Sequence, residues 1–161
     1  MNLPLIDNQN IENKNYTVEQ LPKAEYSCCT FYNCNFENSD LSNITFSECD
    51  FVSCNLSNVS VMHATFNNVT FKDCKLVGVL FQNCNDFLLA LNFRDCTLNL
   101  SSFFQLKINN TAFLNCKMHH VDFTESEAKN TSYFNCDLKS AIFDNTNLEK
   151  ADFLKAHNFL I

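Results

Sequence analysis

Apolar residues recur at every fifth position through most of this 161-residue chain. From Phe31 to Phe81 every fifth residue is apolar, and after a shift of two residues the series resumes at Leu88 and continues to Phe153. Thirteen of the 17 phenylalanines lie in this series. A repeat of five matches neither the 3.6-residue turn of an α-helix nor the two-residue alternation of a strand. The backbone must therefore turn at short, regular intervals.

Cysteine marks a longer repeat of 20 residues. Six cysteines follow one another in steps of 20, with one step of 22 at the shift: Cys34, Cys54, Cys74, Cys96, Cys116 and Cys136. They lie two residues before a series position, where small residues recur, and we expect them to point inward. A CxxC pair, which is typical of zinc sites, is absent from the sequence. We therefore expect reduced cysteines that serve packing, with no metal site and no cofactor.

Asparagine recurs two residues after the series position. Asparagine tolerates the left-handed backbone conformation that some tight turns require. The residues of this kind are Asn33, Asn38, Asn43, Asn58, Asn68, Asn83, Asn110, Asn115, Asn130, Asn135 and Asn145. Each unit of five residues is therefore expected to contain its own corner.

These units resemble the A(D/N)LxX repeat of pentapeptide repeat proteins, as in CNF at 34–36, SDL at 39–41 and ADF at 151–153. The resemblance covers residues 24 to about 157. It implies an all-β fold, a right-handed quadrilateral parallel β-helix with four units to each coil of 20 residues, and about six coils in total. The step of 20 between cysteines independently indicates the same coil length.

The repeat also predicts how the chain is divided. Residues 24–158 are expected to form the β-helix, residues 1–23 an N-terminal arm or cap that lacks the period, and residues 159–161 the C-terminal end. One side of the coil is aromatic at every series position, so its rings should stack as a ladder inside the rod. This column is Phe31, Phe51, Phe71, Phe93, Phe113, Tyr133 and Phe153.

The two-residue shift predicts a short bulge near residues 84–90. Insertions in a solenoid often mark a binding face. The alternative is a tolerated bulge that repacks Phe87 or Leu88 inward.

Composition and histidine placement exclude several function classes. The chain has one glycine, which excludes the glycine-rich loops that bind phosphate groups, and its net charge of −7 argues against direct nucleic-acid binding. Its four histidines fall at surface positions and do not converge, so we expect no enzymatic activity. No apolar run approaches the ~18 residues of a membrane span, and the first residues do not resemble a signal peptide. We therefore expect a cytoplasmic protein that does not contact membranes.

Acidic residues gather on the side of the coil that begins at Ser39. Between residues 34 and 155 this side carries Asp40, Asp122, Glu125 and Asp144 and no base. A rod with an acidic face is suited to a basic protein surface. Within the resembled family, the quinolone-resistance Qnr and MfpA types are held to mimic DNA against type II topoisomerases. The resemblance thus implies a non-enzymatic DNA mimic that binds DNA gyrase or topoisomerase IV and modulates quinolone sensitivity. The alternative is a structural or scaffolding protein with no topoisomerase target.

The C-terminal end leads to an expectation about assembly. The sequence stops soon after the last repeat, which would leave a strand edge and an apolar interior uncovered. We expect a homodimer through an end formed by Phe153, Phe159, Leu160 and Ile161. The alternative cap is Phe159 folded back over Phe153.

Overall fold

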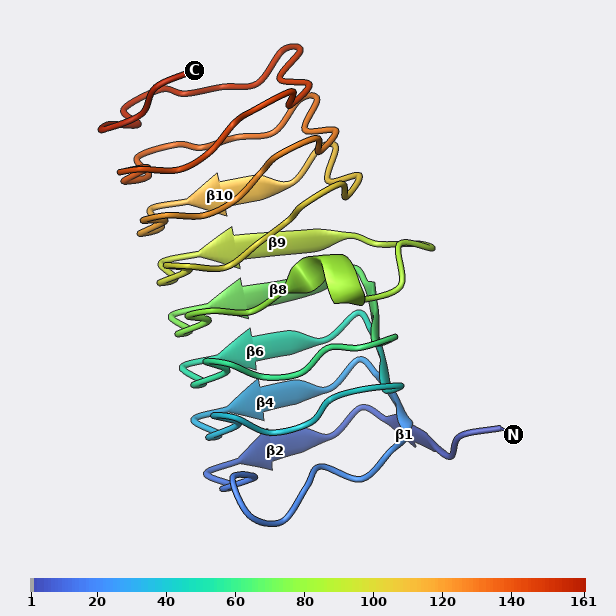
Figure 1. Ribbon diagram of the computed structural model, residues 1–161. Helices are drawn as coiled ribbons and strands as arrows, with labels where there is room; N and C mark the ends of the chain where they lie inside the picture. The colour runs from blue at the N-terminus through green and yellow to red at the C-terminus, as the bar shows by residue number, and fades with distance from the viewer. Residues whose placement is uncertain (1) are drawn as a thin grey trace.

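The computed structural model describes residues 2–161 as a stack of rectangular coils (Figure 1). The predicted fold is confirmed: it is a right-handed quadrilateral parallel β-helix of about six coils. Two of the four sides carry short parallel strands, which pair in register one coil apart. The other two sides are joined by single parallel bridges, such as Asn35 to Asn55 and Asp40 to Ser60.

The side that contains the predicted aromatic column is a six-stranded sheet in the order β10-β9-β8-β6-β4-β2, and we call it the six-stranded side. Its strands are β2 (Asn10–Glu12), β4 (Thr30–Tyr32), β6 (Asp50–Val52), β8 (Val69–Lys72), β9 (Leu91–Arg94) and β10 (Ala112–Leu114). The four-stranded side, in the order β1-β3-β5-β7, lies just before it along the chain. Its strands are β1 (Leu5–Asp7), β3 (Glu25–Ser27), β5 (Thr45–Ser47) and β7 (Thr65–Asn67).

The remaining two sides are named by their residues. The thiol side comprises 34–38 and the equivalent residues of the other coils, and Cys34 lies at its corner with the six-stranded side. The acidic side comprises 39–43 and its equivalents. Along the chain each coil follows the six-stranded, thiol, acidic and four-stranded sides in turn.

The predicted aromatic ladder is present. Phe113 is fully buried and stacks between Phe93 and Tyr133, with ring centroids 5.2 and 5.3 Å away and nearly parallel planes. A second ladder, which we did not predict, runs up the acidic side with centroid spacings of 4.8 to 5.4 Å. Its members are Phe81, Phe103, Phe123 and Phe143. The two ladders meet edge to face, as Phe113 does with Phe123 at 83°, which is a favourable geometry for aromatic pairs.

The corners explain the asparagines. Residues two positions after a series residue adopt positive φ angles, from Asn33 at 52° to Gly78 at 72°. Every predicted asparagine except Asn83 does so. Asn83 ends a short 3-10 helix, η1 (Phe81–Asn83), which replaces the ordinary corner just before the bulge. Left-handed residues thus set the coil shape, and asparagine accepts that conformation at low cost.

The bulge does not pack Phe87 or Leu88 inward, so this alternative is wrong. Phe87 and Leu88 are 74% and 58% exposed, whereas Cys84 is buried and Leu89 packs against the core. Leu88 lies at a corner with φ of 56°, so it cannot be the inward series residue that the five-residue count makes it. In Figure 1 the chain leaves the outline of the rod between η1 and β9.

The N-terminal segment already contains coil structure. Strands β1 and β2 lie within residues 1–23 and pair in parallel with β3 and β4, for example Ile11 with Phe31. The prediction that this segment lacks the period is wrong, because every fifth residue from the sixth onward is apolar. These residues are Ile6, Ile11, Tyr16 and Leu21.

Candidate protein-binding surface

Three of the four predicted acidic residues lie together on two successive coils of the acidic side. Asp122 is bridged in register to Ile142, and the backbone N–H of Glu125 donates to the carbonyl of Asp144 at 2.9 Å. The segments 121–125 and 141–145 contain no lysine, arginine or histidine. We call Asp122, Glu125 and Asp144 the acidic group.

Local hydrogen bonds orient two carboxylates of the acidic group. The Oδ1 atom of Asp122 accepts from the backbone N–H of Thr124 at 2.9 Å. Gln105, one coil below, donates from Nε2 to Oε2 of Glu125 at 2.6 Å. These bonds leave the other carboxylate oxygens free of hydrogen bonds within the described residues. The acidic group is therefore held in place by the repeat while still able to meet a partner.

Asp40 stands apart from the acidic group. Four coil steps separate it from Asp122, at the positions of Ser60, Leu80 and Ser102, a distance of about 19 Å at ~4.8 Å per step. Lys23, in the coil before, places Nζ 3.6 Å from its carboxylate. Hydrogen bonds from Ser42, aided by Lys23, hold the pKa of Asp40 below its ordinary value. The predicted absence of lysine and arginine thus holds for this side only from residue 34 onward, because Lys23 lies on the same side one coil before Asp40.

Apolar side chains occupy part of the acidic side between its two ends. Met62 and Leu80 are 42% and 45% exposed. The side is therefore not a continuous acidic strip. Its negative charge is concentrated at the acidic group, and Asp40 at the far end is paired with Lys23.

Two histidines converge on one carboxylate of the thiol side, which corrects the expectation that none would. The Nε2 atom of His119 lies 2.6 Å from Oδ2 of Asp137, and that of His157 lies 3.9 Å from Oδ1. Asn158 donates from Nδ2 to the same Oδ1 at 2.9 Å. No hydroxyl or thiol of residues 2–161 hydrogen-bonds to either imidazole, so this cluster lacks the nucleophile of a hydrolytic site. It links the last turn to the two coils below.

We predict that this cluster makes stability sensitive to acid. Partial burial opposes ionisation of Asp137, but the hydrogen bonds from His119 and Asn158 prevail and lower its pKa from 3.8 to about 2. A carboxyl with a depressed pKa in the folded state stabilises the fold above its unfolded pKa, and that contribution is lost as the pH falls toward the folded value. Urea unfolding should show a loss between about pH 4 and pH 2 that Asp137→Asn removes. The exposed Asp73→Asn variant should retain it, and equal profiles for all three proteins would contradict the prediction.

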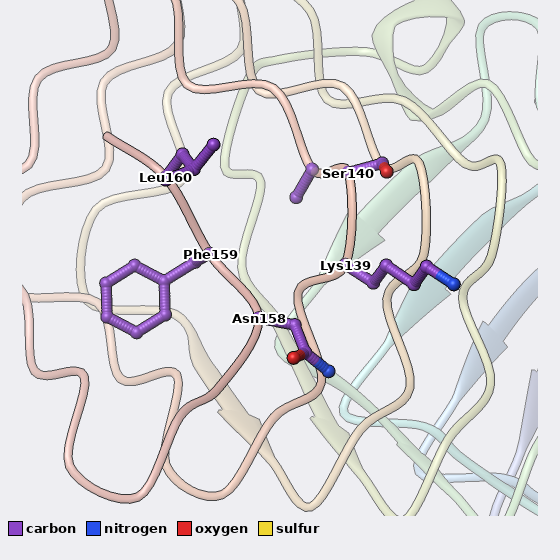
Figure 2. A pocket seen from close by; sticks show the side chains of 6 residues that line it. Lys139, Ser140, Asn158, Phe159 and Leu160 are labelled. Carbon is purple, nitrogen blue, oxygen red and sulfur yellow. The ribbon is translucent and has the colours of Figure 1, made fainter.

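The C-terminal residues fold back over the end of the aromatic ladder. The ring of Phe159 stacks on that of Phe153, with centroids 4.9 Å apart and planes at 28°. Leu160 and Ile161 are 89% and 75% exposed. Figure 2 shows Phe159 and Asn158 on this last segment, beside the hollow that they line with Lys139, Ser140, Ala141 and Leu160. The alternative cap is therefore present, while the homodimer stays a prediction.

Two further observations concern metal binding and membrane spans. Within residues 2–161 no three histidine, cysteine or acidic side chains are grouped so that they could hold a metal ion together. Over the same residues, no helix has the length and apolar character needed to cross a membrane.

Comparison with known proteins places the chain in a family. The sequence profile described as a pentapeptide repeat region matches residues 24–86 and 76–153. No curated protein matches the chain. Solved structures similar to this one include full-length QnrB1, a plasmid-mediated fluoroquinolone resistance protein, at 14% identity and a TM-score of 0.43, covering 96% of this chain and 94% of that one.

Two cyanobacterial structures are also similar. One is Rfr23 from Cyanothece 51142, at 11% identity and a TM-score of 0.31, covering 92% of this chain and 83% of that one. The other is HetL from Nostoc sp. strain PCC 7120, which is involved in heterocyst differentiation regulation. It has 12% identity and a TM-score of 0.27, covering 94% of this chain and 84% of that one. At these identities the likeness concerns the fold alone. With a repeat profile that spans residues 24 to 153 and a coil that turns every five residues, the chain belongs to the pentapeptide repeat family.

Proposed function

We propose that this protein is a non-enzymatic DNA mimic that binds the basic DNA groove of a gyrase-like type II topoisomerase and thereby modulates quinolone sensitivity. The observation that carries the proposal is the acidic group: three carboxylates on successive coils, with no base in the segments that bear them. The partner is accordingly a basic protein surface.

The rod presents its charges in a manner suited to such a groove. The β-helix places equivalent positions at a regular interval of about 4.8 Å, so carboxylates on successive coils form an ordered row of negative charge. Because the bridge and hydrogen bonds described above fix the backbone of the acidic group, little ordering entropy is lost when it binds. Complementary charge speeds association and makes binding weaken as salt increases.

The test is a DNA gyrase supercoiling assay with purified protein, with and without a quinolone. Wild type should protect supercoiling from the quinolone or inhibit it, and this effect should decline with added salt. The triple variant Asp122→Asn, Glu125→Gln, Asp144→Asn should lose at least about tenfold in potency, since each neutralised contact of this kind is worth roughly 0.5 kcal/mol or more.

A matched control removes the same charge from another side. Asp50, Asp73 and Asp95 are exposed carboxylates of the six-stranded side and its corner. Their triple change to asparagine lowers the net negative charge equally but should leave the effect on gyrase intact. If wild type has no effect, or if both triple variants behave alike, mimicry through the acidic group is wrong and a scaffold without a topoisomerase target takes its place.

The homodimer is a second, separate part of the proposal. Leu160 and Ile161 are available to a second copy because both are exposed. Sedimentation equilibrium should then give a mass near twice 18.5 kDa, and Leu160→Ser with Ile161→Ser should shift it toward the monomer. A monomer at all concentrations would show that the Phe159 cap suffices.

A further inference from the structure

The six cysteines spaced by one coil form a continuous column of thiols at the corner between the six-stranded and thiol sides. The flanking residues are paired in register on both sides of the corner, Val52 with Lys72 and Asn55 with Lys75. Cys54 and Cys74 therefore stack one step apart, about 4.8 Å. Both are almost fully buried, at 2% and 3% exposure.

The thiols of this column share one orientation. The Sγ atom of Cys54 donates to the carbonyl of Phe31 at 3.2 Å, and that of Cys74 donates to the carbonyl of Phe51 at 3.2 Å. Cys96 does the same toward Phe71 at 3.3 Å. Because each thiol meets the equivalent carbonyl one coil below, the separation of neighbouring sulfur atoms equals the coil step.

A surface hollow lies over the middle of the column. Its lining includes Cys54 and Cys74 together with Asp73, Asp95 and Lys75. The two carboxylates face solvent and raise the local concentration of cations. The hollow therefore brings solvent up to the two residues that carry these otherwise enclosed thiols.

We propose that Cys54 and Cys74 form a two-coordinate site for a monovalent soft metal ion such as Cu(I) or Ag(I). Thiolates are the ligands that soft ions prefer. Two metal–sulfur bonds in line, at the ~2.3 Å typical of zinc–thiolate bonds, would span about 4.6 Å, which is close to the coil step of about 4.8 Å. Zinc is excluded from this site, because it requires four ligands in a tetrahedron and the described residues offer no group of three or more.

The chemistry of loading is a ligand exchange without oxidation or reduction. One metal ion enters, two S–H bonds break, two metal–sulfur bonds form, and two protons leave to solvent. The resulting dithiolate complex carries one negative charge, which the ammonium of Lys75, on the rim of the same hollow, helps to offset. The hydrogen bonds to Phe31 and Phe51 are lost in the exchange.

The test is a titration of reduced protein with Ag(I) in chloride-free buffer, followed by thiolate-to-metal charge-transfer absorption and by circular dichroism. Cys28 is exposed and would bind silver by itself, so all proteins carry Cys28→Ser. We expect the absorption to saturate at one or more equivalents while the β spectrum is unchanged. Adding Cys54→Ser and Cys74→Ser should remove at least one equivalent.

The variants are chosen to fold. Ser39, Ser101 and Ser126 occupy the equivalent inward position and are buried, so serine is accepted there. Cys54→Ala with Cys74→Ala is the second variant, because Ala24 and Ala64 fill the same position elsewhere and are buried.

The control is Cys84→Ser in the same background, since Ala64 and Leu106 are the residues one coil below and above Cys84 and neither is a thiol. It should leave the stoichiometry unchanged. Three results would each overturn the proposal: no silver uptake, uptake only as the β spectrum is lost, or an unchanged stoichiometry in the Cys54 and Cys74 variants. None of these depends on gyrase.

Discussion

Replacing Phe113 by alanine is expected to lower the free energy of unfolding by about 3–5 kcal/mol. Phe113 is fully buried and lies inside the longer ladder, stacked on Phe93 and Tyr133. It also meets Phe103 and Phe123 of the second ladder edge to face, at 5.5 and 5.8 Å. Removing the ring leaves a cavity between two coils whose backbones are fixed by the β-helix, so the neighbours can close it only in part.

Urea unfolding followed by circular dichroism measures the loss, with Asn68→Ala as the control. Asn68 is exposed, but it has φ of 57° and donates to Glu48 at 2.7 Å. Its change should cost about 1–2 kcal/mol, mainly because alanine is less tolerant of that conformation. If Phe113→Ala costs no more than Asn68→Ala, the ladder is not the main source of stability.

Replacing Tyr133 by phenylalanine is expected to raise the free energy of unfolding by about 1–3 kcal/mol. Tyr133 is fully buried, and its Oη atom has no hydrogen-bond partner among the described residues. The nearby hydroxyl of Thr131 donates to the carbonyl of Ala128 at 2.7 Å and is not placed to accept a hydrogen bond from Tyr133. A buried hydroxyl without a partner loses its hydration and gains nothing in return, and phenylalanine occupies the same column above and below it.

Tyr26 provides the matched control. It is buried to the same degree, but its hydroxyl donates to the carbonyl of Pro22 at 2.7 Å. Tyr26→Phe should therefore lower stability by about 0.5–1.5 kcal/mol. The prediction for Tyr133 fails if Tyr133→Phe lowers the unfolding midpoint or leaves it unchanged, and the missing hydrogen bond is not the cause if Tyr26→Phe raises the midpoint equally.

The sequence predicted the architecture well because one physical feature, an inward side chain every five residues, is repeated in each unit. The first ladder followed directly, since residues 20 apart fall in one column. The second ladder was missed although Phe81, Phe103, Phe123 and Phe143 show the same spacing. The N-terminal coil was missed because no phenylalanine marks the period there: Ile6 lies within the apolar run LPLI, and Ile11 stands alone among polar residues.

The local departures could not be predicted from a count of positions. At the bulge, either Leu88 or Leu89 could have pointed inward. Which one does so depends on which residue the corner forces into a left-handed conformation. The contacts of Asp137 with His119 and His157 join three coils across 38 residues of sequence. Whether such side chains meet depends on their rotamers rather than on the repeat. The pairing of Lys23 with Asp40 does not follow from the predicted repeat, because Lys23 belongs to the N-terminal coil and the repeat was expected to begin at residue 24.

The coil step has a consequence for how the chain folds. In every strand pair the partners are 20 residues apart, or 22 across the bulge, as Glu25 is from Thr45 and Thr70 from Asn92. The chain entropy lost in closing each loop depends on that separation, so it is the same for the first coil and the last. Parallel sheets usually join distant segments and form slowly. Here assembly can begin at any coil and extend by its neighbours, so lengthening the rod would add steps without making any single step harder.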